Sequence, residues 1–565
     1  MKNYTSFFLV LFTAISFGQK KYPQKDFRSP LDIPIVLAGT FGELRNNHFH
    51  SGIDIKTQQR EGLNIYAVAD GYVSRIRVSL WGYGKVIYIT HPNGYTTVYA
   101  HVSKFGKGIE EYVKKIQYQK ERYETGNIYL KPGKMTVKKG QVIAFSGSTG
   151  GFVSPHLHYE IRNTASEKII NPMLFGILVK DTIPPVFKGV FVYPLGDTSR
   201  VNSTVKKSLL AFKPKGNNSH TTNRISASGT IGFSVKVYDR LNNTYNRNGI
   251  YGLEMFVNGL KVYHHNVEIF SFAESKYINL LIDYKQLAQY KRRFQRTHKI
   301  KGNQLSIYKK LINKGVLQIE KGFNYNVEIV ATDFNGNKST LKIPVRGIES
   351  NKLFKTQKDT TAFKINATQF HKFQQENITV AFPKNTFYKD FYLDFSVKNG
   401  VAYIHKPTIP LDKKYTLTFD VSSYTENEKD QLYIANINNE KYPNYQATVK
   451  RKTTFYTTTK TLGNYTLLID NQNPEIKLKN FKNKQWISKS TKIIVKISDK
   501  GSGIKSYRAS IDNQWVLMEY DLKKKQLVYL FKDKELVGSK HEFNIIVSDN
   551  VGNTNMLNAT FYKKQ

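Results

Sequence analysis

Short apolar runs that alternate with polar positions recur along the chain, and turn-forming residues separate them. This alternation is typical of half-buried β-strands. In the first third of the chain it predicts strands over residues 64–69, 71–78, 85–90, 96–101, 141–146 and 156–162. Pro92-Asn93-Gly94 predicts a hairpin turn between the third and fourth of these strands. The pattern therefore predicts a β domain here.

One segment of this domain has helical spacing instead. Between residue 109 and about residue 124, glutamates and lysines separate apolar residues that fall on one face of a helix: Ile109, Tyr112, Val113, Ile116 and Tyr123. Gly126 is placed as a C-terminal stop. We predict one helix inserted into the β domain.

The C-terminal part of the chain contains an internal repeat. Three pairs of segments match, namely 184–187 with 474–477, 233–239 with 493–499, and 327–337 with 543–553. Alternating strands and Asp-x-x-Gly-Asn turns predict immunoglobulin-like sandwiches. We expect the Asp and Asn side chains of these turns to bond their own backbone, with a calcium site built on them as the alternative.

A chain of 565 residues is too long for one core, and three or four domains are expected. We predict a mainly β protein, in which an antiparallel β domain with one inserted helix precedes three β-sandwich-like domains. The predicted boundaries are 1–18 for a signal peptide, 19–182 for the first domain, 183–349 for a sandwich, 350–471 for a β-rich domain and 472–565 for a second sandwich.

The first 18 residues have the composition of a secretory signal. Lys2 supplies the positive start, residues 7–12 the apolar centre and residues 14–18 the small-residue exit. The apolar run is shorter than the roughly 20 residues of a spanning helix, and no later segment is long enough. We expect an exported, periplasmic or envelope-associated protein that is soluble after cleavage, with a retained N-terminal anchor as the alternative.

Composition narrows the chemistry. The chain has no cysteine, which excludes thiolate metal ligands, a cysteine nucleophile and lipoprotein attachment. The formal net charge of +42 favours binding to anionic envelope polymers through a basic surface. Nucleic acid is not expected as a partner, because the lysines are spread over the whole chain instead of gathered on one helix or arm.

Two groups of residues could supply a hydrolytic metal site. One is Pro155-His156-Leu157-His158-Tyr159-Glu160, and the other is His50-Ser51-Gly52-Ile53-Asp54. The first lies in a predicted strand, where residues two apart point to the same face. One imidazole can then bind a metal while its neighbour reaches a substrate held there.

Further motifs occur in order between and around these groups: Gly62, Ala69-Asp70-Gly71, Gly82-Tyr83-Gly84, Tyr99-Ala100-His101, Lys139-Gly140-Gln141-Val142-Ile143 and Gly147-Ser148-Thr149-Gly150. Together they resemble the lysostaphin/LytM-type zinc endopeptidases, the M23 peptidase family, which cleave peptide bonds of peptidoglycan. The resemblance covers residues about 30–175 and says nothing about the rest of the chain.

The resemblance implies one Zn²⁺ per chain with His50, Asp54 and His158 as ligands, and His101 and His156 as unligated catalytic histidines. Two imidazoles and one carboxylate leave a coordination position open for water, whose pKa zinc lowers. Alternatives remain for single residues. His50 and Asp54 could form an ordinary turn pair, His101 could be a packed histidine, and His156 could support a ligand by hydrogen bonding.

The resemblance, together with the predicted signal peptide, implies an exported zinc endopeptidase that hydrolyses peptidoglycan, with D-alanyl–diaminopimelate bonds as the expected target. The alternatives are an activator of other wall hydrolases without enzymatic activity and an envelope scaffold. The inserted helix could gate the substrate groove or pack away from it. We expect Glu160 to have a structural role, and His48 to be a loop residue outside the site.

Overall fold

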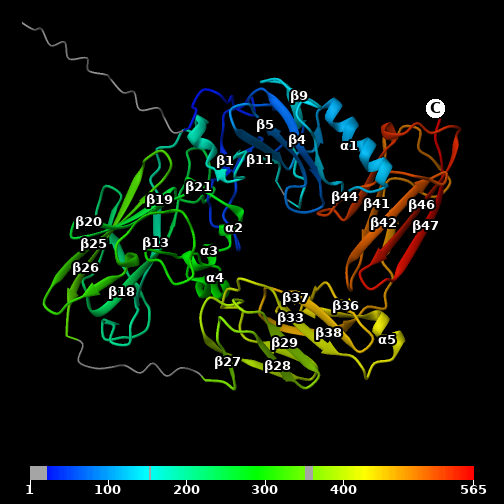
Figure 1. Ribbon diagram of the computed structural model, residues 1–565. Coiled ribbons are helices and arrows are strands. Elements are labelled where there is room, and N and C mark those ends of the chain that lie inside the picture. The colour runs from blue at the N-terminus through cyan, green and yellow to red at the C-terminus, as the bar shows by residue number, and fades with distance from the viewer. Residues whose placement is uncertain (1–21, 152–153, 350–359, 565) are drawn as a thin grey trace, which may run out of the picture.

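The computed structural model describes residues 22–151, 154–349 and 360–564, and the chain is mainly β (Figure 1). The predicted signal peptide over residues 1–18 lies outside the described residues. An N-terminal domain (residues 22–182) precedes three β-sandwich-like modules, here called the second (183–349), third (360–470) and last (472–564) modules. None of the described helices has the length and apolar character required to cross a membrane.

The main sheet of the N-terminal domain carries the functional candidates. Along its principal path the order is β1 (Leu37–Gly39), β2 (Ile53–Lys56), β11 (His156–Asn163), β6 (Tyr95–Ala100), β5 (Lys85–Thr90), β4 (Gly71–Val78) and β8 (Gly126–Tyr129). At its margins are β9 (Thr136–Val137) and β12 (Ile169–Ile170). A smaller sheet contains β3 (Asn64–Tyr66), β10 (Val142–Phe145) and β7 (Lys104–Phe105). The neighbouring strands of the principal path are antiparallel.

The alternation of apolar and polar residues determines which side chains point into the core and which point to the opposite face of the sheet. Ile53 and Ile55 on β2, and Leu157 and Tyr159 on β11, belong to the hydrophobic core and are 0% exposed. Because successive side chains of a strand point to opposite faces, the polar residues between them stand on the other face of the sheet. The candidate ligands of β2 and β11 therefore share that face.

The predicted strands 71–78 and 85–90 have the observed bounds of β4 and β5, and the other four differ at their ends.

The predicted helix extended too far toward the C-terminus. Helix α1 spans Lys107–Lys120, and Glu121 ends it in the left-handed conformation with φ 47°. Gly126 instead starts β8, which pairs with β4. The Thr125 hydroxyl accepts a hydrogen bond from the Val78 backbone, so residues before Gly126 already join the sheet.

The second module is organised around one long strand. Strand β18 (Ile225–Tyr238) pairs with both β13 (Val186–Pro194) and β26 (Lys338–Gly347), so its sheet is continuous. The other strands of the module are β14 (Arg200–Val201), β15 (Ser208–Leu210), β16 (Phe212–Pro214), β17 (Ser219–Thr222), β19 (Gly252–Val257), β20 (Leu260–Asn266), β21 (Ile269–Phe270), β22 (Gln295–Arg296), β23 (Tyr308–Leu311), β24 (Leu317–Ile319) and β25 (Asn324–Thr332). Its short helices are α2 (Phe272–Ser275), α3 (Ile278–Leu281) and α4 (Tyr284–Tyr290). Strand β21 pairs with β12, which joins this module to the N-terminal sheet.

The third module contains two five-stranded sheets. One consists of β28 (His371–Gln375), β29 (Ile378–Phe382), β33 (Tyr415–Asp420), β37 (Thr454–Thr459) and β36 (Val449–Lys450). The other consists of β31 (Phe395–Lys398), β32 (Val401–Ile404), β38 (Gly463–Ile469), β34 (Leu432–Asn436) and β35 (Asn444–Tyr445). Strands β27 (Phe363–Ile365) and β30 (Phe391–Leu393) form a separate pair, and α5 covers Glu426–Gln431.

The last module also has two sheets. The strands of one are β39 (Glu475–Leu478), β41 (Lys492–Ser498), β45 (Gln526–Leu530) and β44 (Glu519–Asp521). Those of the other are β40 (Gln485–Trp486), β47 (Thr554–Tyr562), β46 (Lys540–Asp549), β42 (Ile504–Ile511) and β43 (Gln514–Trp515). The strands of the internal repeat pair alike, since β13 pairs with β18 as β39 does with β41. The immunoglobulin-like topology stays a prediction.

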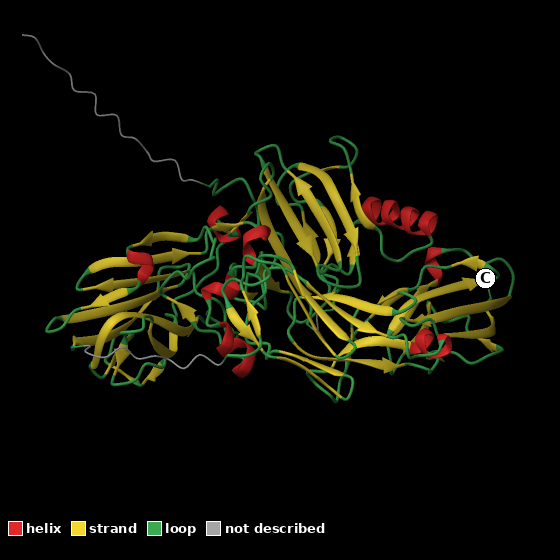
Figure 2. Cartoon of the chain, turned by 60° about the horizontal axis from the view of Figure 1, so that its bottom comes forward, coloured by secondary structure: helices red, strands yellow, loops and turns green. Residues whose placement is uncertain are grey.

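The last module returns to the N-terminal domain, so the four parts close into a ring (Figures 1 and 2). Trp515 packs edge-on against Tyr118 of α1, with ring centroids 5.2 Å apart, and Lys114 of the same helix pairs with Asp533. Lys523 donates to the Ser148 carbonyl at 3.0 Å, close to the candidate site. These contacts favour the packing alternative for the inserted helix.

A buried ion pair lies at the interface between the last module and the N-terminal domain. The Lys85 ammonium is 6% exposed and lies 2.9 Å from a Glu519 carboxylate oxygen, which raises the pKa of Lys85 against the effect of burial. In Glu519→Gln the lysine charge would stay buried without its partner. We expect a loss of about 2 kcal/mol at this interface, less than for a fully buried pair because Glu519 is partly exposed.

The tryptophan fluorescence of the full chain during urea unfolding, with Trp81 and Trp486 replaced by Phe so that Trp515 alone reports, measures this loss. Glu535→Gln, at an exposed position of the same module, is the matched control. An unfolding midpoint that is equal in the two variants would contradict the role of the ion pair.

Candidate metal centre

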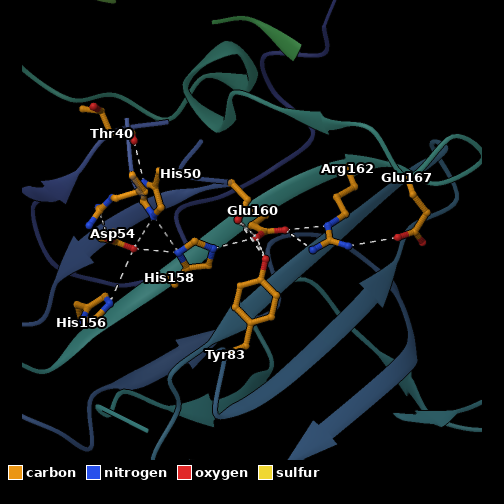
Figure 3. Close-up of polar contacts among 11 residues, drawn as sticks. Thr40, His50, Asp54, Tyr83, His156, His158, Glu160, Arg162 and Glu167 are labelled. Atoms are coloured by element: carbon orange, nitrogen blue, oxygen red, sulfur yellow. Dashed lines mark hydrogen bonds and ion pairs between the residues drawn. The ribbon is translucent and has the colours of Figure 1, made fainter. Parts of the chain in front are cut away.

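The register of two strand pairs assembles the site. Asp54 on β2 is directly opposite His158 on β11. On the other side of β11, His158 is opposite Ala100, the last residue of β6, which places His101 beside it. His50 precedes β2, and its backbone exchanges hydrogen bonds with Glu43 and Gly42. Residues that are distant in sequence therefore meet on one face of the sheet (Figure 3).

Three donor atoms converge there. His50 Nε2 lies 3.0 Å from Asp54 Oδ1 and 3.1 Å from His158 Nδ1, and His158 Nδ1 lies 2.9 Å from Asp54 Oδ1. Tetrahedral ligands of zinc would be separated by roughly 3.3 Å, given bonds of about 2.0 Å. All three side chains are buried. The separation and chemistry of these donors fit one metal ion.

The outer nitrogens of both imidazoles are already occupied. His50 Nδ1 donates to the Thr40 carbonyl at 2.8 Å, and His158 Nε2 donates to Glu160 Oε1 at 2.9 Å (Figure 3). A carbonyl or carboxylate oxygen can only accept, so these nitrogens carry the protons. The inner nitrogens then present lone pairs to the metal position, as ligating histidines do.

The site favours positive charge. Burial alone would raise the pKa of Asp54, but the neighbouring His50 and His158 lower it well below its usual range, so the carboxylate is ionised. Burial opposes a charge on His158, yet Asp54 and Glu160 raise its pKa to about 9. These carboxylates stabilise a cation at this position, whether a proton or a metal ion.

Glu160 orients His158 and has no place among the inner donors. It is fully buried, and its Oε1 also accepts hydrogen bonds from Ser51 and Tyr83, at 2.6 and 2.5 Å. Its Oε2 accepts two hydrogen bonds from Arg162 at 2.7 and 2.5 Å, and the arginine keeps the pKa of Glu160 low despite burial. Such outer partners fix the orientation of a ligating imidazole.

Two further histidines stand next to the donors. The ring of His101 is 4.8 Å from that of His156 and 5.6 Å from that of His158, measured between centroids. His156 Nε2 lies 3.8 Å from Asp54 Oδ1. In both, Nδ1 donates to a backbone carbonyl, of Thr149 for His101 and of Ser154 for His156. Burial lowers the pKa of both, so each neutral ring can accept a proton at Nε2.

Two glycine-rich turns hold His101. A Cβ on Gly150 would lie 2.2 Å from the Gly82 carbonyl oxygen, so the turns approach backbone to backbone. Thr149 belongs to the second of these turns, Gly147–Gly151, and its carbonyl accepts a hydrogen bond from His101. His101 itself has φ 62°, a left-handed conformation that is uncommon outside glycine. The Gly147–Gly151 segment therefore forms the turn before β11 and also positions the His101 ring.

The structure brings together all five residues proposed from the sequence: His50, Asp54, His101, His156 and His158. Sequence reasoning assigned no role to several residues that support them: Thr40, Arg45, Ser51, Tyr83 and Arg162. The alternation along β11 could have identified Arg162, because it follows His156, His158 and Glu160 on the same face. Nothing in the sequence indicated Arg45, which contacts Asp54 Oδ2 at 3.3 Å.

The glycine between His50 and Asp54 allows β2 to approach β11. A Cβ on Gly52 would lie 2.4 Å from the Tyr159 carbonyl oxygen and 3.0 Å from His158 Cε1. Gly52→Ala is therefore expected to separate the ligands and weaken zinc binding at least about 10-fold. Competition with a chromophoric chelator measures this. Gly108→Ala, where a Cβ meets nothing within 4 Å, is the control, and equal zinc affinities would contradict the prediction.

Two family models match the chain. Residues 48–119 match Peptidase family M23, and residues 360–470 match a Zu5-like domain. The first range contains His50, Asp54 and His101, and ends before β11.

Several curated proteins are similar to the N-terminal domain. The DD-carboxypeptidase/endopeptidase Mpg of Neisseria meningitidis is 36% identical over 113 residues, which is 20% of this chain and 20% of that protein. The peptidoglycan DD-endopeptidase ShyB of Vibrio cholerae is 31% identical over 112 residues, again 20% of each. An uncharacterised metalloprotease of Haemophilus influenzae is 33% identical over 124 residues, 22% of this chain and 20% of that protein. The chain thus spans about a fifth of the length of these relatives.

Among solved structures, the lysostaphin catalytic domain of Staphylococcus simulans is 25% identical, covering 24% of this chain and 87% of that one with a TM-score of 0.18. A zinc-containing peptidase of Vibrio cholerae is 27% identical, covering 24% and 37% with a TM-score of 0.18. The family match over residues 48–119 agrees with the motifs found in the sequence. The N-terminal domain of this chain matches Peptidase family M23 over residues 48–119, and it resembles M23 peptidases.

Proposed function

We propose that the chain is an exported zinc endopeptidase that hydrolyses peptide bonds of peptidoglycan. The convergence of His50 Nε2, Asp54 Oδ1 and His158 Nδ1, with all three pairs separated by 2.9–3.1 Å, supports the proposal most strongly. Two imidazoles and one carboxylate form the donor set of several catalytic zinc sites. A complete set favours an enzyme over an activator or scaffold without catalytic activity.

The donor set would hold one zinc ion per chain, which supplies Lewis-acid polarisation of the scissile carbonyl and makes water more acidic. Asp54 contributes negative charge, and Glu160 holds His158 in the ligating orientation. His101 and His156 are neutral, so one can take a proton from the attacking water. Once protonated, an imidazole can donate to the leaving amine or stabilise the oxyanion.

The substrate proposal follows from the relatives. The names of two of them include DD-endopeptidase or DD-carboxypeptidase/endopeptidase activity, and we extend this to the D-alanyl–diaminopimelate cross-links. A net charge of +42 would draw the protein to anionic polymers of the envelope, where its three modules position the N-terminal domain. Export would place the enzyme in the periplasm or on the envelope.

Digestion of purified diaminopimelate-type peptidoglycan by the full chain tests this proposal. Mass spectrometry should show cross-linked muropeptide dimers converted to monomers, stopped by a chelator and restored by one equivalent of zinc. Asp54→Asn should release no monomers, whereas Asp197→Asn, an exposed position in the second module, should release them as the unchanged protein does. Zinc-loaded protein that leaves dimers intact would refute the enzyme and favour the activator.

A further inference from the structure

A second group of acidic side chains lies where the N-terminal domain joins the second module, apart from the zinc donors. One carboxylate oxygen from each of Asp181, Asp239 and Asp333 lies within 4.8 Å of the others. The three residues are only 6%, 2% and 2% exposed. Asp181 belongs to the connection from the N-terminal domain, Asp239 follows β18, and Asp333 follows β25. Burying three like charges together is costly without a cation, and burial beside Asp333 and Asp181 raises the pKa of Asp239 to about 8.

The described part of the chain supplies no cation at this position. None of these three carboxylates forms an ion pair within residues 22–151, 154–349 and 360–564. Hydrogen bonds explain only part of the arrangement. Asp333 Oδ1 accepts from the Asn337 backbone at 2.8 Å, as expected for a turn, and Asp181 Oδ1 accepts from the Ile183 backbone at 3.0 Å. The turn role therefore covers Asp333 and leaves Asp239 unexplained.

Buried polar atoms without hydrogen-bond partners occur within and next to this group of carboxylates. Among the residues that the structure describes, Asp239 Oδ1 and Asp181 Oδ2 have no hydrogen-bond partner. Asn248, 2% exposed, has none for either atom of its side-chain amide. Asn248 is directly opposite Asp239 in an antiparallel bridge, and each backbone N–H bonds the other carbonyl at 2.9 Å. The side chains of directly opposed residues leave the same face of such a pair, which puts the Asn248 amide within reach of the carboxylate group.

There is room for a ligand at this position. A cavity of about 20 Å³ is lined by Asp181 and Asp239, by Thr40 and Asn171 of the N-terminal domain, and by apolar side chains that include Leu241 and Phe334. That volume accommodates one ion or one water molecule. The last module repeats the arrangement, because Asp470, Asp499 and Asp549 occupy the corresponding positions of the internal repeat and also lie within 4.8 Å of one another.

We propose that Asp181, Asp239, Asp333 and the Asn248 amide oxygen bind one calcium ion. Carboxylate and amide oxygens without nitrogen or sulfur donors suit a hard cation. Calcium accepts many protein oxygens in irregular geometry, whereas magnesium retains more of its water. Since Asp181 lies in the connection between domains, and Asn335 Nδ2 donates to the Val179 carbonyl of that connection at 2.8 Å, the ion would stiffen the joint that carries the peptidase.

Calcium titration of the full chain, after removal of metals and reloading with one equivalent of zinc, tests the proposal. Calorimetry should show that Asp239→Asn binds one calcium ion fewer per chain than the unchanged protein. Calcium should raise the melting temperature less in this variant than in the unchanged protein. Without calcium, Asp239→Asn should melt no lower, because it replaces a buried carboxyl whose ionisation the neighbouring carboxylates oppose. Asp197→Asn, exposed in the same module, should bind calcium as the unchanged protein does.

Asn248→Ala provides a second variant, since it keeps all three carboxylates and should weaken calcium at this site about 10-fold. Calcium stoichiometry that is equal in Asp239→Asn and the unchanged protein, zero included, would overturn the proposal. Neither calcium stoichiometry nor melting temperature depends on peptidoglycan digestion. The calcium proposal can therefore fail or succeed independently of the proposed peptidase activity.

Discussion

His158→Ala is expected to abolish both zinc binding and muropeptide release. His158 Nδ1 is one of the three converging donors, and the other two side chains cannot replace it because His50 and Asp54 already supply one inner atom each. The substitution also leaves Glu160 buried without the imidazole that donates to it. We expect less than about a tenth of the zinc of the unchanged protein, and a loss of at least about 10³-fold in turnover.

Metal analysis by mass spectrometry, together with muropeptide analysis of digested sacculi, measures both quantities. His48→Ala is the matched control, because His48 is exposed on the loop before His50 and donates only to the Asn46 carbonyl. It should keep zinc and activity. A His158→Ala protein that retains one zinc per chain would remove this residue from the donor set.

His101→Ala is expected to separate metal binding from catalysis. The His101 ring stands 5.6 Å from that of His158, and its Nδ1 is fixed by the Thr149 carbonyl, so it contributes no atom to the converging donors. Loss of a positioned acid or base typically costs about 10²–10⁴-fold in rate. We therefore expect a full zinc complement and a turnover lower by about that factor.

The same two measurements serve for this variant, with His156→Ala examined in parallel. His101 has a left-handed backbone conformation, which asparagine tolerates. His101→Asn therefore separates the loss of the imidazole from a change in backbone geometry. Zinc lost from His101→Ala and His101→Asn alike would reassign His101 to the ligands. Turnover unchanged in both would make it a packed histidine.

The strands and the candidate residues could be predicted from the sequence, but the contacts between distant segments could not. Alternation identified β4 and β5 with their observed bounds. It also placed His156 and His158 on one face of β11, because side chains two apart in a strand share a face. The pairing of Asp54 with His158 depends on register, which neither segment specifies by itself.

Long-range packing accounts for the predictions that failed or were missing. Helix α1 ends at Lys120 because Glu121 takes the left-handed position that sequence reasoning gave to Gly126, and Thr125 is already bonded to β4. The return of the last module onto the N-terminal domain gave no local signal, because the partners lie far apart in the chain: Trp515 packs on Tyr118 of this helix, and Glu519 pairs with Lys85 of β5. The aspartates of the repeat could be identified in the sequence, but the sequence did not indicate that they are buried together.

Anomalous diffraction at the zinc edge from crystals of the zinc-loaded full chain tests the metal centre most directly. We predict one strong peak in the N-terminal domain, within bonding distance of His50 Nε2, His158 Nδ1 and a carboxylate oxygen of Asp54, with His101 and His156 beside it. A zinc peak bound elsewhere, or one that lacks any of these three ligands, would contradict the proposed centre.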